Sequence, residues 1–127
     1  WEAIQCCAHH RIDNIKAIMD VNRQQCDGAM DSVMEVGNIK TKMENFGAVV
    51  VEVDAHNVGD MREAAKIKHE GKPLIVLANS NPFHAMPILE ERFPRLHYVR
   101  FKSEDERARM NHAIADALGV DPIDYAR

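Results

Sequence analysis

The chain has 127 residues, of which 46% are hydrophobic and 28% charged, and its formal net charge is −4. This length and composition are typical of one ordinary globular domain. Basic and acidic residues are interleaved, and no apolar run approaches the ~20 residues of a membrane span, so we expect no nucleic-acid partner and no membrane partner. Three cysteines do not make a disulfide framework, which favours reduced thiols and a cytoplasmic location.

Apolar spacing predicts helices and strands in alternation along the chain. Residues 48–53 contain four valines and give the strongest strand signal, and the apolar run at 15–21 is typical of a strand buried on both faces. The predicted elements are a helix at 2–10, a strand at 15–21, a polar loop at 22–28, a loop with one helical turn at 29–37, a helix at 38–46, a strand at 48–53, a helix from the N-cap Asn57 to 70, a strand at 74–78, a helix at 84–92, a strand at 96–101 and a helix from the N-cap Ser103 to 118.

Alternation of this kind indicates an α/β fold, an open and mostly parallel sheet with helices on both faces. We expect residues 1–127 to form a single α/β domain. The chain opens inside a helix pattern with no strand before it, so the sheet is expected to be incomplete at its N-terminus. An apolar sheet that lacks a strand predicts burial against another chain.

The polar loop after the strand at 15–21 holds the candidate site. Ligands of open α/β sheets bind at the carboxyl ends of the strands, which is where Asn22 and Gln24 stand. An Asn side-chain oxygen and a backbone carbonyl two residues later are suitable ligands for Mg²⁺, which binds through few protein groups plus substrate phosphates. The alternative is that Asn22 only stabilises a turn, as Asn commonly does.

Six short motifs follow one another in residues 1–78. They are Trp1-Glu2-Ala3, Ala8-His9-His10 followed by Asp13-Asn14, Asp20-Val21-Asn22 followed by Asp27-Gly28, Glu44-Asn45-Phe46-Gly47, Val53-Asp54-Ala55-His56-Asn57, and Gly71-Lys72-Pro73. In order and spacing they resemble the thiamine-diphosphate-binding domain of transketolase. Residues 79–127 form a βα tail that matches no motif of that family.

The resemblance implies thiamine diphosphate and a divalent metal, Mg²⁺ or Ca²⁺, as cofactors. In the family an Asn that matches Asn22 and the backbone carbonyl two residues on, here that of Gln24, bind the metal. Cys26 matches a position that lines the cofactor pocket, and His56 is expected to contact the cofactor. The alternative for His56 is that it only hydrogen-bonds its own loop.

The chain departs from the family pattern at three places. The family's Gly-Asp-Gly motif, which supplies another metal ligand, would precede Trp1, and its Asp-Gly-His motif reads Asp54-Ala55-His56 here. After Ala78 the family continues with a Lys-Thr and glycine-rich segment that leads to an active-site histidine, and this chain instead has Asn79-Ser80-Asn81-Pro82-Phe83-His84. Whether His84 takes the role of that histidine stays open, and we assign no catalytic residue.

Cys6-Cys7 and His9-His10 suggest a zinc cluster at first sight. Adjacent pairs on one helix point around its circumference, however, and cannot all converge on one ion. Two alternatives remain for the histidines: packing and capping at the end of the helix, or contact with a ligand phosphate.

The resemblance implies a transketolase-like transferase that moves a two-carbon ketol unit between sugar phosphates, with the cofactor providing the difficult chemistry. In the family a second domain completes the site, so we expect a homo- or hetero-oligomer and an inactive isolated chain. The alternative is a non-catalytic α/β fragment or subunit that needs a partner chain to form a site.

Overall fold

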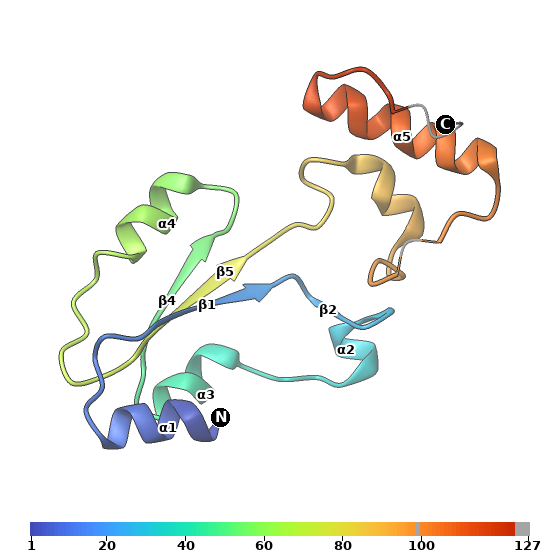
Figure 1. Cartoon of the computed structure of the whole chain (residues 1–127). Coiled ribbons are helices and arrows are strands. Elements are labelled where there is room, and N and C mark those ends of the chain that lie inside the picture. The colour runs from blue at the N-terminus through green and yellow to red at the C-terminus, as the bar shows by residue number, and fades with distance from the viewer. Residues whose placement is uncertain (99, 124–127) are drawn as a thin grey trace. The chain divides into compact units, whose positions relative to one another are not determined.

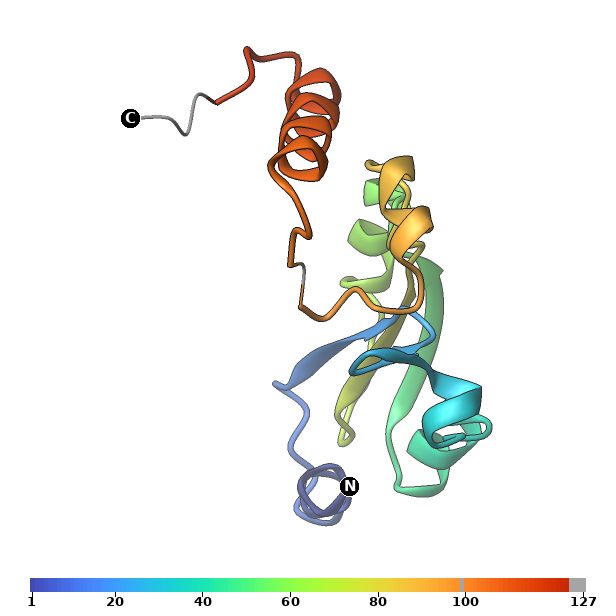
Figure 2. The same cartoon turned by 90° about the vertical axis from the view of Figure 1, so that its right-hand side faces the viewer.

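The computed structural model describes residues 1–98 and 100–123, which divide into two compact units (Figure 1, Figure 2). Unit 1 comprises Trp1–Arg23 and Met34–Ser80, and unit 2 comprises Gln24–Val33 and Asn81–Arg127. Among the described residues, no helix is both long enough and apolar enough to cross a membrane.

Unit 1 is a three-stranded parallel sheet with helices on both faces, which confirms the predicted α/β fold class. The strand order is β1-β5-β4, so the last of the three strands in the chain lies in the middle. Lys16 of β1 and Val49 of β4 both pair with Leu74 at the start of β5. The elements are α1 (Glu2–His9), β1 (Lys16–Val21), α3 (Ile39–Asn45), β4 (Val49–Asp54), α4 (Val58–Ala64) and β5 (Leu74–Asn79).

Two apolar clusters hold helices against opposite faces of this sheet. Successive residues of β5 point to opposite faces, as strand geometry requires, and Leu74 to Ala78 are all buried. Figure 1 shows α4 on one side of the sheet and α1 and α3 on the other. The clusters consist of Met43, Ala48, Ile75 and Leu77 on the α3 side, and of Ala64, Leu74 and Val76 on the α4 side.

The prediction that β1 is buried on both faces is wrong. β1 is an edge strand of the described sheet, and Ile18 at its centre is 65% exposed. The register places Ile18 beside Val76, whose face α4 covers, so α4 does not extend over β1. An apolar run cannot distinguish a central strand from an edge strand, because the position in the sheet depends on the crossovers.

The helix after Asn57 is shorter than its apolar spacing predicts. Asn57 is the N-cap as expected, and its side chain accepts hydrogen bonds from the backbone of Gly59 and Asp60 (2.9 and 3.2 Å). The backbone N–H groups of Lys66 and Ile67 donate to carbonyls three residues back (3.0 and 3.2 Å). Such bonds tighten the last turn, so the helix ends at Ala64 rather than near residue 70.

Unit 2 contains short elements and one long helix. The single helical turn predicted within 29–37 is present, and the helix predicted at 84–92 is a 3-10 helix that begins at Pro87. Sequence patterning did not predict a small antiparallel hairpin that precedes the helical turn. The elements are β2 (Gln24–Gln25), β3 (Gly28–Ala29), α2 (Met30–Val33), η1 (Pro87–Arg92) and α5 (Glu104–Leu118).

The strand predicted at 96–101 is wrong for residues 96–98 and 100–101, and Val99 lies outside the described residues. Charged side chains bond the backbone at the end of this segment and just after it. Arg92 Nη2 donates to the carbonyl oxygen of Arg100 at 2.6 Å, and the N–H of Lys102 donates to Glu106 Oε2 at 2.6 Å. Side chains of η1 and α5 therefore bind residues 100 and 102, and the described residues of the segment, 96–98 and 100–101, do not join a sheet.

Replacing Gly47 by Ala should destabilise unit 1 by about 1–3 kcal/mol. Gly47 has a φ of +91°, and an added Cβ would lie 2.7 Å from the Cβ of Ala8. Urea denaturation measures the effect. Gly71→Ala is the control, because Gly71 also has a positive φ (+69°) but only the flexible side chain of Arg11 lies nearby. An equal or smaller loss at Gly47 would contradict the close approach of α1.

Candidate functional site at the carboxyl edge of the sheet

Polar residues gather where the three strands of unit 1 end. The register aligns Val21, Asn79 and Asp54 across β1, β5 and β4. Two backbone hydrogen bonds continue this pairing past the strands: Ser80 N–H donates to Val21 at 3.3 Å, and Ala55 N–H donates to Asn79 at 2.9 Å. The segments that leave the sheet are therefore fixed to one another at this edge.

Asp20 is the centre of a side-chain network at this edge. Asn22 Nδ2 donates to one carboxylate oxygen of Asp20 at 3.0 Å, and the hydroxyl of Ser80 donates to the other. The second bond joins β1 to a residue sixty positions along the chain. Because the amide nitrogen of Asn22 faces Asp20, the amide oxygen is directed away from that carboxylate.

His56 follows β4, so the structure brings it to the same edge as Asn22, with β5 between their strands. Its backbone N–H donates to Asp54 Oδ1 at 2.9 Å, an Asx turn that sets the direction of the chain after the strand. The next residue, Asn57, begins α4. The edge thus carries two carboxylates, from Asp20 and Asp54, that attract a cation.

Gln24 and Cys26 belong to unit 2. Gln24 begins β2, and Cys26 lies between β2 and β3 with an exposed free thiol. Cys26 and Arg23 have φ values of 53° and 60°. Residues with side chains seldom adopt this left-handed region, and such positions cluster in ligand-binding and active-site loops.

The polar groups at this edge are mainly oxygen donors, the kind of group that hard divalent cations bind. Among residues 1–98 and 100–123, no group of three or more His, Cys, Asp or Glu side chains could hold a metal ion. A cation at this edge would need the amide oxygen of Asn22 and a backbone carbonyl beside ligand oxygens. Mg²⁺ and Ca²⁺ accept such neutral oxygens together with phosphate.

Of the other candidates, His9 and His10 contact each other edge to face at the end of α1, with ring centroids 4.8 Å apart. His84 is in unit 2, where its backbone N–H donates to Asn81 at 3.1 Å. Sequence reasoning missed the roles of Asp20 and Ser80. Polar residues at the ends of apolar runs were the available signal, but their pairing requires knowledge of which strands are neighbours.

Comparison with known proteins finds transketolases. The chain is 28% identical to an uncharacterized transketolase family protein of Sinorhizobium fredii over 108 residues, which cover 83% of this chain and 38% of that protein. It is 28% identical over 106 residues to one of the subunits of apulose-4-phosphate transketolase from Actinobacillus succinogenes, with the same coverage. It is 29% identical over 82 residues to 6-deoxy-6-sulfo-D-fructose transketolase subunit SqwG of a Clostridium species, covering 63% of this chain and 30% of that protein.

The chain therefore spans less than two thirds of the length of these relatives. No protein-family model matches the chain, and no solved structure matches it. The relatives cover most of the chain, and unit 1 has the parallel α/β architecture that the resemblance implies. These findings show that the chain is similar to proteins of the transketolase family, and they support a transketolase-like domain.

Proposed function

We propose that this chain is the part of a transketolase-like enzyme that binds thiamine diphosphate and a divalent metal, Mg²⁺ or Ca²⁺. The enzyme would transfer a two-carbon ketol unit between sugar phosphates. The network of Asn22, Asp20 and Ser80 at the carboxyl edge carries the proposal, because it fixes an amide oxygen where an open α/β sheet binds ligands. The bound cofactor supplies the reactive carbon of its thiazolium ring.

The residues of the edge have distinct tasks in this proposal. Asn22 contributes its amide oxygen to the metal. Asp20 holds the Asn22 amide in that orientation, and Ser80 holds Asp20, so both are positioning residues. Groups that orient a metal ligand in this way are typically worth 10–100-fold in metal affinity, by the general rule for outer-shell partners.

Three further contacts follow from the resemblance. The backbone carbonyl of Gln24 is proposed as the second metal ligand from this chain. Cys26 is proposed to line the cofactor pocket, and the left-handed backbone at this residue supports a fixed loop. His56 is proposed to contact the cofactor, which its place at the carboxyl end of β4 supports.

The enzyme would need a partner chain that supplies the second half of the site, and the isolated chain would be inactive. Two of the relatives are named as transketolase subunits, and their names specify sugars that carry a phosphate or sulfo group. This supports a sugar phosphate substrate and a homo- or hetero-oligomer. The same subunit names favour a second candidate, in which this chain is a non-catalytic α/β fragment or subunit that needs a partner chain to form a site.

The free thiols of Cys6, Cys7 and Cys26 support the cytoplasmic location expected from the sequence.

Calorimetric titration with thiamine diphosphate tests the proposal. We expect binding in Mg²⁺ or Ca²⁺ that is lost in EDTA, for this chain alone and more tightly with a partner chain. Titration of Mg²⁺ without thiamine diphosphate is the control. Equal binding in EDTA, or none under any condition, would contradict the metal–diphosphate site and leave the non-catalytic alternative.

A further inference from the structure

Unit 2 contains a cavity of about 670 Å³ that the proposed function does not use. Its wall comes from η1, the segment that follows it, the start of α5 and the turn between β2 and β3. This volume lies within the range of small-molecule sites in proteins. The charged and aromatic residues of its wall that could contact a ligand are Asp27, Arg95, Tyr98, Arg100, Phe101 and Lys102.

The acidic residues at this cavity are largely neutralised. Glu106 forms an ion pair with Arg92 at 2.9 Å, and both side chains are mostly buried, with 19% and 14% exposed. Glu91 pairs with Arg109, which does not line the cavity, at 2.7 Å. Within the described residues, these pairs leave the wall with an excess of positive charge.

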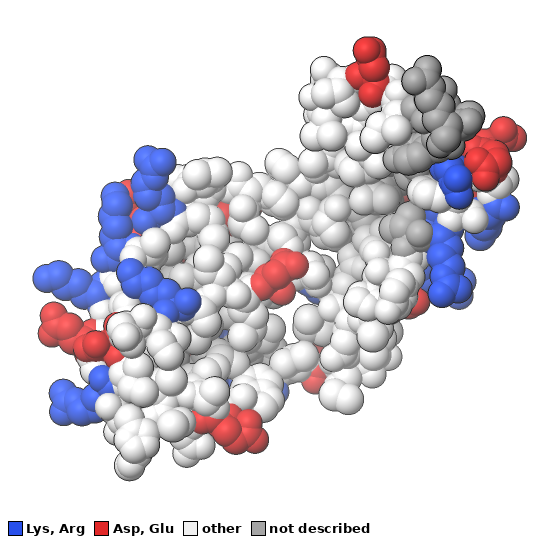
Figure 3. Space-filling view, in the orientation of Figure 1, with Lys and Arg blue, Asp and Glu red and all other residues white. Residues whose placement is uncertain are grey.

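Three cations supply that excess. In the part of the chain that the structure describes, the side chains of Arg95, Arg100 and Lys102 have no acidic partner within 4 Å, and Asp27 is the unpaired carboxylate opposing them. Figure 3 shows Lys and Arg side chains beside one another on the part of unit 2 where α5 begins, with acidic side chains next to them. Arg forks and Lys ammonium groups are the side chains that recognise phosphate.

The backbone that carries Arg100 and Lys102 is held in place. Arg92 donates to the carbonyl oxygen of Arg100 at 2.6 Å, and the N–H of Lys102 donates to Glu106 at 2.6 Å. The buried Arg92–Glu106 pair therefore fixes the segment at two points, on either side of Phe101. Cations anchored in this way lose less conformational entropy when they bind an anion.

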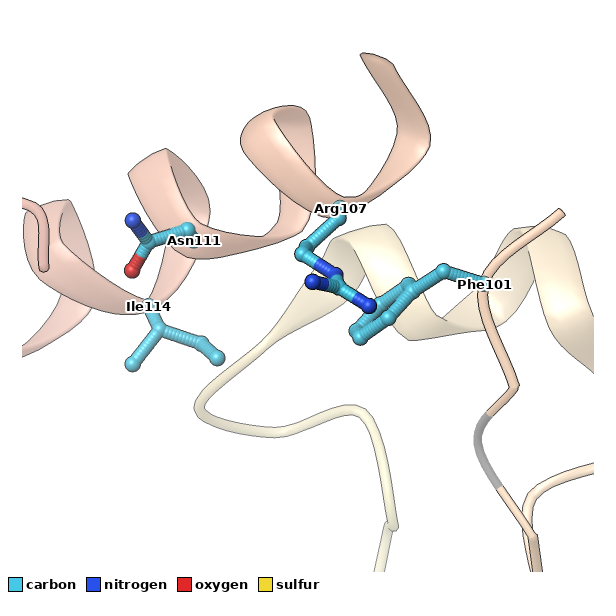
Figure 4. Close-up of a pocket in the computed structure, with 4 residues that line it drawn as sticks. All are labelled: Phe101, Arg107, Asn111 and Ile114. Carbon is cyan, nitrogen blue, oxygen red and sulfur yellow. The ribbon is translucent and has the colours of Figure 1, made fainter. Parts of the chain in front are cut away.

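Aromatic rings form the rest of the wall, and each has a neighbour that orients it. Tyr98 contacts His97 edge to face with centroids 4.6 Å apart. Phe101 also lines a smaller cavity of about 230 Å³, where the guanidinium of Arg107 lies 5.7 Å from its ring centroid (Figure 4). Tyr98 and Phe101 are nevertheless 65% and 39% exposed. Exposed, oriented rings beside cations suit a ligand with an aromatic ring of its own.

We propose that this cavity of unit 2 binds a nucleoside 5′-monophosphate, with the phosphate on Arg100 and Lys102 and the base against Tyr98. Asp27 would accept a hydrogen bond from a hydroxyl or amino group of the ligand. The proposal concerns unit 2 alone and does not depend on thiamine diphosphate.

Calorimetric titration with AMP in EDTA tests it, with adenosine, ribose 5-phosphate and inorganic phosphate as the other probes. We expect AMP to bind about tenfold more tightly than each of the others, because each lacks either the charge-assisted bonds or the stacking. Adenosine or inorganic phosphate binding as tightly as AMP would overturn the ligand class.

Substitutions in the cavity wall test the contacts to the phosphate and to the base separately. The double variant Arg100→Gln, Lys102→Gln should lower the affinity for AMP at least about tenfold. The control double variant Arg62→Gln, Lys68→Gln removes two exposed charges from unit 1 and should leave the affinity for AMP unchanged. Tyr98→Ala should lower the affinity for AMP about tenfold but should not change the affinity for ribose 5-phosphate. If the double variant Arg100→Gln, Lys102→Gln bound AMP as tightly as the wild type, the proposed site would be wrong. Asn22→Ala, which lies in the other unit, should bind AMP like the wild type.

Discussion

Replacing Leu77 by Ala is expected to lower the free energy of unfolding of unit 1 by about 2–5 kcal/mol. Leu77 is 2% exposed, lies in the central strand and packs with Met43 and Ile75. Its removal would lose apolar transfer energy and leave a cavity that the two flanking strands cannot fill. Urea denaturation followed by circular dichroism gives the value.

Ile18→Ala is the matched control for this prediction. Ile18 is also an apolar strand residue of the same sheet, but 65% of it is exposed, so its loss should cost less than about 1 kcal/mol. If the two substitutions cost the same, Ile18 is buried in solution and another chain covers that face of β1. A small loss at Leu77 would contradict the central position of β5.

Asn22→Ala is expected to weaken metal-dependent binding of thiamine diphosphate by about 100-fold or more, because it removes the amide oxygen proposed as a metal ligand. Asp20→Ala should weaken it about 10–100-fold, since the Asn22 amide would lose the partner that orients it. Calorimetry in Mg²⁺ and in EDTA separates these effects from any loss of fold.

Asn45→Ala is the control for these variants, because Asn45 is an exposed amide residue of α3 in the same unit. It should bind like the wild type. Unchanged binding in Asn22→Ala would contradict the metal assignment, and equal losses in Asn22→Ala and Asn45→Ala would attribute the effect to general destabilisation.

Local signals predicted much of unit 1. The four valines of 48–53 gave β4 within one residue, and the Asn57 N-cap gave the start of α4. Alternation of helices and strands then predicted the parallel sheet. Asn22 and His56 each follow a strand, which predicted that both would lie at the carboxyl edge of the sheet. These features depend on neighbours in the chain, which the sequence displays directly.

Features that depend on distant contacts could not be predicted. The bond from Ser80 to Asp20 joins residues sixty positions apart and depends on β5 lying beside β1. The strands β2 and β3 have two residues each, too few for a periodicity. The apolar residues at 96–101 are typical of a strand, but the carbonyl of Arg100 is bonded by the side chain of Arg92, a contact that the local pattern does not display.

The most direct test of the proposed cofactor site is nuclear magnetic resonance with Mn²⁺ in place of Mg²⁺, recorded with excess thiamine diphosphate. The paramagnetic ion should broaden the amide signals of Val21, Asn22 and Ser80 at the carboxyl edge, and that of Gln25, whose peptide bond contains the Gln24 carbonyl. Signals of Lys16 and Leu74 at the opposite ends of the strands should stay sharp. Broadening at Lys16 and Leu74, or none at the carboxyl edge, would contradict the account.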